Sequence, residues 1–109
     1  MFVDFTADWC LTCKANEVAA IDRPEVARLL RDQGIVALRA DKTQPAPEAD
    51  ETLRRLGNKS ASIPFYAIFP SDSPRRPLLL DGIFTSPTPI LQALQRAGPS
   101  RGVKTASAR

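Results

Sequence analysis

The chain has 109 residues, enough for one domain with a modest core of its own. Its composition, 43% hydrophobic and 25% charged, is typical of a globular protein, and no apolar run is long enough to span a bilayer. The net charge of +3 comes from Arg101, Lys104 and Arg109, because the other 12 of the 15 basic side chains are balanced by 12 acidic ones. A neutral body without a basic stripe gives no reason to expect a nucleic-acid partner.

The start of the chain lacks the charged segment, apolar stretch and small-residue cleavage site of a signal peptide. It opens directly on the apolar segment MFVDFTA, so we expect a piece of a longer protein. We expect residues 1–98 to form one domain and residues 99–109 to form a disordered basic tail.

The first elements predicted in chain order form a strand–helix–strand unit. Residues 2–7 are β-rich with apolar side chains on both alternating faces, the pattern of a central strand covered on both sides. Helix formers follow over 9–21, and Asp22 is placed to cap a second helix over 23–33. The β-rich segment 35–42 then predicts a strand parallel to the first.

The second half of the chain predicts a helix, a hairpin and a final helix. A polar helix is expected over 48–58, after a proline-bearing loop. The segments 62–70 and 78–84 are separated by a turn rich in breakers and predict an antiparallel hairpin. A last helix over 86–98 opens with prolines and ends at a glycine. The predicted order is β-α-α-β-α-β-β-α.

The chain's two cysteines, Cys10 and Cys13, lie in the segment ADWCLTCKANE, and three interpretations compete for them. A structural disulfide is disfavoured, because closing so small a loop constrains the unfolded chain least. A structural zinc site needs four ligands, and the chain has no histidine, so only an inter-chain clip or recruited carboxylates would supply them. A C-x-x-C pair beside a βαβ pattern is instead typical of a redox site.

The redox interpretation assigns a separate role to each cysteine. Cys10 would lie at a helix N-terminus, where unpaired N–H groups and the helix dipole stabilise a thiolate. Cys13 would lie one turn further, within reach of a mixed disulfide formed at Cys10. We therefore expect Cys10 to be the attacking nucleophile and Cys13 the resolving thiol. This chemistry requires no cofactor and no metal.

Two acids near the cysteines are candidates for moving the proton. Asp4 lies mid-strand on a strand expected to be buried, where desolvation should raise its pKa; the alternative is an acid at a turn or sheet edge. Glu17 shares the helix face of the cysteines, although its spacing fits a solvated helix acid equally well. Trp9 is expected to cover the site, to form a docking surface or to pack in the core; its spacing does not decide which.

The stretch FVDFTADWCLTCKANE closely resembles the motif of the thioredoxin-fold domains at the C-terminus of bacterial DsbD-type membrane reductases. The related suppressor-of-copper-sensitivity proteins are similar as well. The resemblance extends to LRADKT and SIPFYAIF and covers most of residues 2–97, with the cysteine region the most specific part. It implies a thioredoxin-like α/β fold: a three-layer sandwich with a four-stranded mixed sheet and helices on both faces.

The resemblance also implies site residues. Asp4 and Glu17 match the acidic pair that tunes the cysteines in this family. Pro64 would follow a cis peptide bond beside the cysteines, and the backbone of Ile63 would pair with an extended substrate. From the residues alone, Pro64 is equally able to begin a strand.

The implied activity is that of a protein-disulfide reductase that relays electrons. A membrane-embedded domain of the same polypeptide would donate them, and a periplasmic thiol–disulfide oxidoreductase domain would accept them. The chain would thus be a periplasmic domain of a bacterial inner-membrane protein, monomeric when isolated. The main alternative is a non-catalytic thioredoxin-like binding module, and the inter-chain zinc clip remains a further one.

Two departures from the family pattern stand out. The extra strand or helix that precedes the Asp4 strand in the typical fold is missing, so we expect either a trimmed chain or an uncovered sheet edge. The dipeptide Leu11-Thr12 between the cysteines differs from the common pairs. That difference bears on the reduction potential and leaves the chemistry unchanged.

Overall fold

The computed structural model describes residues 1–98; the tail expected at 99–109 lies outside the described residues. The order of elements agrees with the prediction, apart from a π-helical segment after the first helix. In chain order the elements are β1 (Phe2–Thr6), α1 (Leu11–Asn16), the π-helical η1 (Glu17–Ile21), α2 (Pro24–Gln33), β2 (Ala37–Asp41), α3 (Pro47–Arg55), β3 (Phe65–Ile68), β4 (Leu78–Asp81) and α4 (Thr88–Ala97).

The four strands form one mixed sheet in the order β2-β1-β3-β4. β1 pairs in parallel with β2 and antiparallel with β3, and β3 and β4 form the predicted hairpin. In this register Asp4 of β1 lies beside Arg39 of β2 and Tyr66 of β3. Asp4 is therefore at the centre of the sheet, and its interpretation as a turn or edge acid is wrong.

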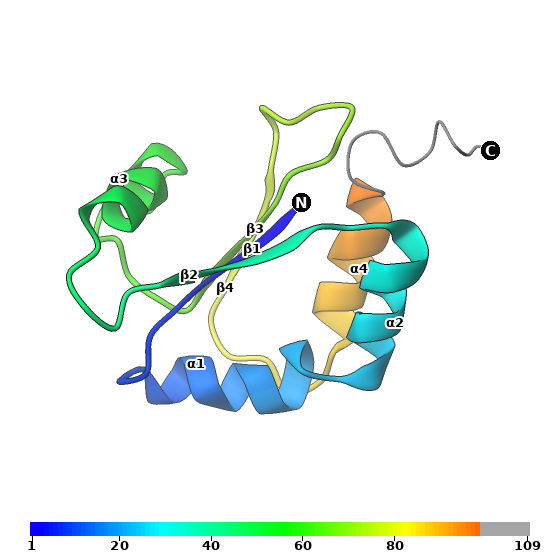
Figure 1. The fold of residues 1–109 in the computed structure, drawn as a ribbon, viewed down its shortest axis with the longest axis horizontal. Coiled ribbons are helices and arrows are strands. Elements are labelled where there is room, and N and C mark those ends of the chain that lie inside the picture. Colours follow the sequence, from blue (N-terminus) through cyan, green and yellow to red (C-terminus); the bar gives the residue numbers. More distant parts are fainter. Residues whose placement is uncertain (99–109) are drawn as a thin grey trace.

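Helices cover both faces of the sheet, which confirms the three-layer sandwich (Figure 1). Because side chains alternate along a strand, Phe2 faces one layer and Phe5 the other. Phe2 packs in a core with residues of η1, α2 and α4. Phe5 packs on the opposite face, against Leu53 of α3. Each core is lined by side chains that are almost fully buried.

The junction between η1 and α2 differs from the prediction that Asp22 caps the second helix. Arg23 occupies the N-cap position, in an extended conformation and without a side-chain cap bond. The reason is Pro24, whose ring disfavours a helical conformation in the residue before it. Asp22 instead ends η1, where its backbone N–H donates to the carbonyl of Glu17 at 2.7 Å. Its carboxylate instead pairs with Arg39 of β2.

Within the described residues β2 is an edge strand, paired with β1 alone. Leu38, in the middle of β2, is 50% exposed. No helix within residues 1–98 combines the length and the apolar character needed to cross a bilayer.

Candidate active site

Cys10 and Cys13 form a disulfide at the start of α1. Cys10 is the N-cap residue, and the backbone N–H of Cys13 donates to Cys10 Sγ at 3.1 Å. A hydrogen bond of this kind is stronger to a thiolate than to a neutral thiol, so the helix start favours ionised Cys10 after reduction. Cys10 is 7% exposed and Cys13 only 1%, so Cys10 is the more accessible cysteine.

Large apolar side chains flank the accessible cysteine on the surface. Trp9 is 60% exposed, and its indole Nε1 donates to the carbonyl of Lys42 at 3.3 Å. Leu11 is 83% exposed. Trp9 is therefore not a core residue.

The loop that precedes β3 completes the rim of the cysteine site. The Ile63–Pro64 peptide bond is cis, as the resemblance implies, and Ile63 packs against the cysteine cluster. Ala61 has a left-handed backbone (φ 53°), an uncommon conformation for a residue other than glycine. Its carbonyl accepts a 2.6 Å hydrogen bond from Lys42 Nζ. Lys42 thus tethers the loop through its side chain, while its backbone carbonyl holds Trp9.

Asp4 and Glu17 are both buried, at 3% and 7% exposure. The interpretation of Glu17 as a solvated helix acid is therefore wrong. Thr6 Oγ1 donates to Glu17 Oε2 at 2.9 Å, which anchors the helix acid to β1. Lys14 Nζ lies 3.6 Å from Glu17 Oε1 and supplies a partly exposed counter-charge.

Burial raises the pKa of Asp4 from 3.8 to about 6, and the negative charges of Glu17 and Asp22 act in the same direction. Arg39 acts in the opposite direction, with its Nε 3.4 Å from Asp4 Oδ2. Asp4 Oδ2 accepts no well-formed hydrogen bond from the described residues. A carboxyl in this state changes charge close to neutral pH, which suits a group that takes up and returns a proton.

Three contacts of the acids were missed from the sequence. Thr6 could have been found, because strand alternation puts it on the same face as Asp4. Arg39 and Asp22 carried no such signal. Arg39 meets Asp4 through the register between β1 and β2, and Arg39 Nη2 lies 3.6 Å from Asp22 Oδ1.

Asn16, the last residue of α1, was also missed, because an asparagine in a helix normally looks like a surface residue. It is fully buried and joins α1 to the segment after β4. Its Nδ2 donates to the carbonyl of Gly82 at 2.8 Å and to the Tyr66 hydroxyl at 3.0 Å, and its Oδ1 accepts from the N–H of Phe84 at 2.9 Å. These bonds fix the helix that carries the cysteines against the sheet.

Comparisons with known proteins agree with this geometry. A family model described as thioredoxin-like matches residues 1–71. The structure is similar to the reduced DsbD C-terminal domain of Neisseria meningitidis, with a TM-score of 0.67 and 25% identity over 87% of this chain and 78% of that one. The oxidised form of that domain gives a TM-score of 0.66 and 25% identity over 84% and 75%.

A more distant likeness, informative for the fold alone, is to a thioredoxin from Thermus thermophilus, with a TM-score of 0.59 and 20% identity over 98% of this chain and 76% of that one. The comparison with curated proteins finds no match. The disulfide-bonded C-x-x-C pair at a helix start, in this fold, is the arrangement of a thiol–disulfide oxidoreductase. The chain belongs to the thioredoxin-like family and is a DsbD-type thioredoxin-like domain built for dithiol–disulfide exchange.

Proposed function

We propose that this domain is a protein-disulfide reductase that relays electrons from a membrane-embedded donor to a periplasmic thiol–disulfide oxidoreductase. The observation that carries the proposal is the Cys10–Cys13 disulfide at the start of α1, with two buried carboxyls on the adjoining strand and helix. The likeness to the DsbD C-terminal domain supports the relay.

In the first step, reduced Cys10 acts as the nucleophile. Its thiolate attacks one sulfur of the partner's disulfide, a mixed disulfide forms, and the partner's other sulfur leaves as a thiolate. The greater exposure of Cys10 and the hydrogen bond from the Cys13 N–H both support this assignment.

In the second step, Cys13 resolves the mixed disulfide. Cys13 loses its proton, attacks Cys10 Sγ and releases the second partner thiolate, so two electrons pass to the partner and the Cys10–Cys13 disulfide forms. Because Cys13 is buried, its thiolate is costly without a nearby base. We assign proton transfer to Asp4, assisted by Glu17, and a donor dithiol then reverses the sequence to regenerate the domain.

Partner recognition is assigned to the rim of the cysteine site. The exposed ring of Trp9 offers an apolar contact beside Cys10. The backbone of Ile63, before Pro64, is proposed to pair with an extended partner segment, since Ile63 packs directly on the cysteine cluster. No cofactor takes part in this scheme.

The location of the domain is part of the proposal. We propose that it faces the periplasm and belongs to a bacterial inner-membrane protein that also contains the donor domain. A maleimide that does not cross the inner membrane would label reduced Cys10 in intact spheroplasts of a strain that produces the full protein. Labelling only after lysis would contradict the periplasmic placement.

The deciding measurement is the reduction potential of the cysteine pair, obtained by equilibration with dithiothreitol or glutathione buffers. A two-electron transition at about −200 to −270 mV supports a reductase. A value near −120 mV, typical of a disulfide donor, would reverse the proposed direction. If no reversible transition is found, the redox function fails.

Cysteine variants separate catalysis from binding. Cys13→Ser should accumulate a mixed disulfide with a model disulfide such as oxidised glutathione, whereas Cys10→Ser should form none. A non-catalytic binding module would instead keep its partner affinity unchanged when both cysteines become serine. An inter-chain zinc clip would show bound metal and would lose its dimer on addition of chelator.

A further inference from the structure

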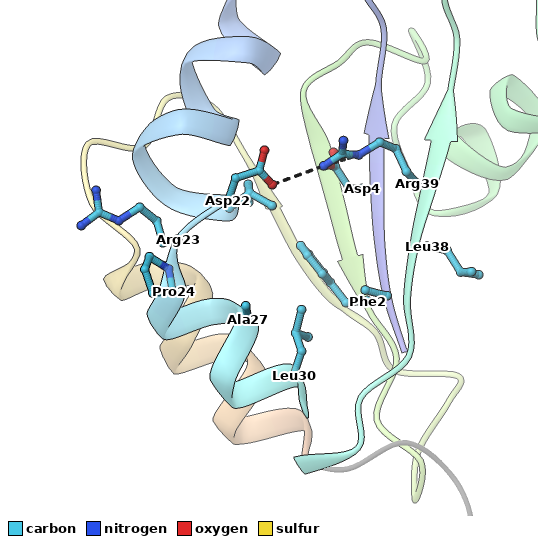
Figure 2. A pocket seen from close by; sticks show the side chains of 11 residues that line it. Phe2, Asp4, Asp22, Arg23, Pro24, Ala27, Leu30, Leu38 and Arg39 are labelled. Atoms are coloured by element: carbon cyan, nitrogen blue, oxygen red, sulfur yellow. Dashed lines mark ion pairs between the residues drawn. The ribbon is translucent and has the colours of Figure 1, made fainter. Parts of the chain in front are cut away.

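A cavity of about 630 Å³ opens between α2 and the β1–β2 part of the sheet (Figure 2). Most of its wall is apolar, but four charged residues also line it. Arg23 pairs with Glu25, whereas the other three are linked to one another by ion pairs near the end where η1 meets α2. These three are Asp4, Asp22 and Arg39.

The three charged groups form a chain from the buried sheet to the solvent. Arg39 is shared between two carboxylates: its Nε lies 3.4 Å from Asp4 Oδ2 and its Nη2 lies 3.6 Å from Asp22 Oδ1. The Asp4 side chain is only 5% exposed, whereas those of Arg39 and Asp22 are 49% and 60% exposed. The planar guanidinium, with five donors, can serve both carboxylates.

Asp22 is held at a position from which its carboxylate competes with that of Asp4 for the Arg39 guanidinium. The bend between η1 and α2 positions it, since its backbone N–H donates to the Glu17 carbonyl and Pro24 follows two residues later. We propose that Asp22 is a positioning residue for the exchange reaction: by drawing Arg39 towards the cavity mouth, it leaves Asp4 free to take up and release a proton through the cavity. This inference rests on the proposed function of Asp4.

The charges that face Asp4 explain the expected direction of each change. Arg39 comes from β2, Glu17 from η1, Asp22 from the turn before α2, and Tyr66 from the neighbouring strand β3. Arg39 is the cation of the group and lowers the pKa of Asp4, while Glu17 and Asp22 raise it. Loss of Asp22 removes a repelling charge and lets Arg39 pair fully with Asp4, and loss of Arg39 does the reverse.

Two variants in the same chain of charges should therefore shift the protonation of Asp4 in opposite directions. Arg39→Gln should make Asp4 hold its proton about tenfold or more tightly. Asp22→Asn should loosen the proton by at least about twofold. A merely structural loosening would move both variants the same way.

The experiment uses two readouts on the folded domain. Carboxyl-carbon NMR titration of Asp4 reports its protonation directly. Single-turnover oxidation of the reduced domain by glutathione disulfide, followed from pH 4.5 to 9 by the fluorescence of Trp9, the chain's sole tryptophan, reports the reaction. Arg23→Gln is the matched control, because Arg23 lines the same cavity but pairs with Glu25.

The inference is supported if Arg39→Gln and Asp22→Asn shift the titration of Asp4 in opposite directions. The low-pH limb of the plot of exchange rate against pH should shift in the same two directions. An unchanged Asp4 titration in Asp22→Asn, with normal exchange in the wild type, overturns the inference and leaves the proposed function intact. A third outcome is that the titrations shift as expected while the exchange rate of the wild type does not change with pH in the range where Asp4 titrates. In that case the proton-transfer role proposed for Asp4 fails instead.

Discussion

Replacing Asp4 with asparagine should stabilise the oxidised domain at neutral pH while slowing the exchange reaction. The aspartate is buried in the middle of the sheet, and its pKa is raised from 3.8 to about 6. That shift corresponds to about 3 kcal/mol of destabilisation whenever the carboxylate is charged. Asparagine fills nearly the same volume without the charge, and the Arg39 that it leaves behind is half exposed and can be solvated.

The sign of the pH dependence follows from where each state binds the proton. Between pH 3.8 and about 6, the folded protein holds a proton that the unfolded chain has already released. The stabilising effect of that proton is fully present below pH 3.8 and is lost as the pH rises through 6. The wild type should therefore lose about 3 kcal/mol from this group across that window, and Asp4→Asn should lose none of it.

Urea denaturation of the oxidised protein at several values between pH 4 and 7.5 measures this difference. Asp4→Asn should be more stable than the wild type by about 1–3 kcal/mol at pH 7.5, with the advantage gone at pH 4. The control is Asp32→Asn, on an exposed position of α2, which should run parallel to the wild type. If Asp4→Asn also runs parallel to the wild type over the whole range, Asp4 has no raised pKa and the reasoning fails.

Three further predictions concern the site and its support. Asn16→Ala should reduce the free energy of unfolding by about 3 kcal/mol, measured in urea, because it leaves the Gly82 carbonyl and the Phe84 N–H without their partner; a loss below about 1 kcal/mol would show that water replaces the side chain. Trp9→Ala should change stability by about 1 kcal/mol or less but slow reduction of a protein disulfide more than reduction of a small one, and equal slowing of both would argue against docking. Leu53→Ala should destabilise the domain by about 2–5 kcal/mol in the same urea assay. The reduction potential should stay unchanged, because Leu53 packs in the core on the sheet face away from Asp4. A changed potential would mean that the two faces are coupled.

Local patterns were enough to predict the elements and their order. Strand alternation, helix formers and breakers identified the strands and helices. The C-x-x-C spacing identified the chemistry, because one helical turn is enough to bring the two cysteines of a redox pair together. The prediction for Asp22 was wrong, because Pro24 forces an extended residue directly before the helix and displaces the cap to Arg23. The position of Trp9 in the sequence did not predict whether its side chain is exposed. Exposure depends on which surfaces the rest of the fold covers.

The sequence by itself determined the βαβ start, the paired cysteines and the unusual position of Asp4, since each follows from residues close together in the chain. The tertiary structure decided which groups surround that carboxyl. Arg39 reaches Asp4 because two parallel strands pair in one register, and Asp22 reaches Arg39 because a helix bends at one point. Contacts between residues 17 or 35 positions apart leave no local pattern, and here they act together with burial on the pKa of the group proposed to move the proton.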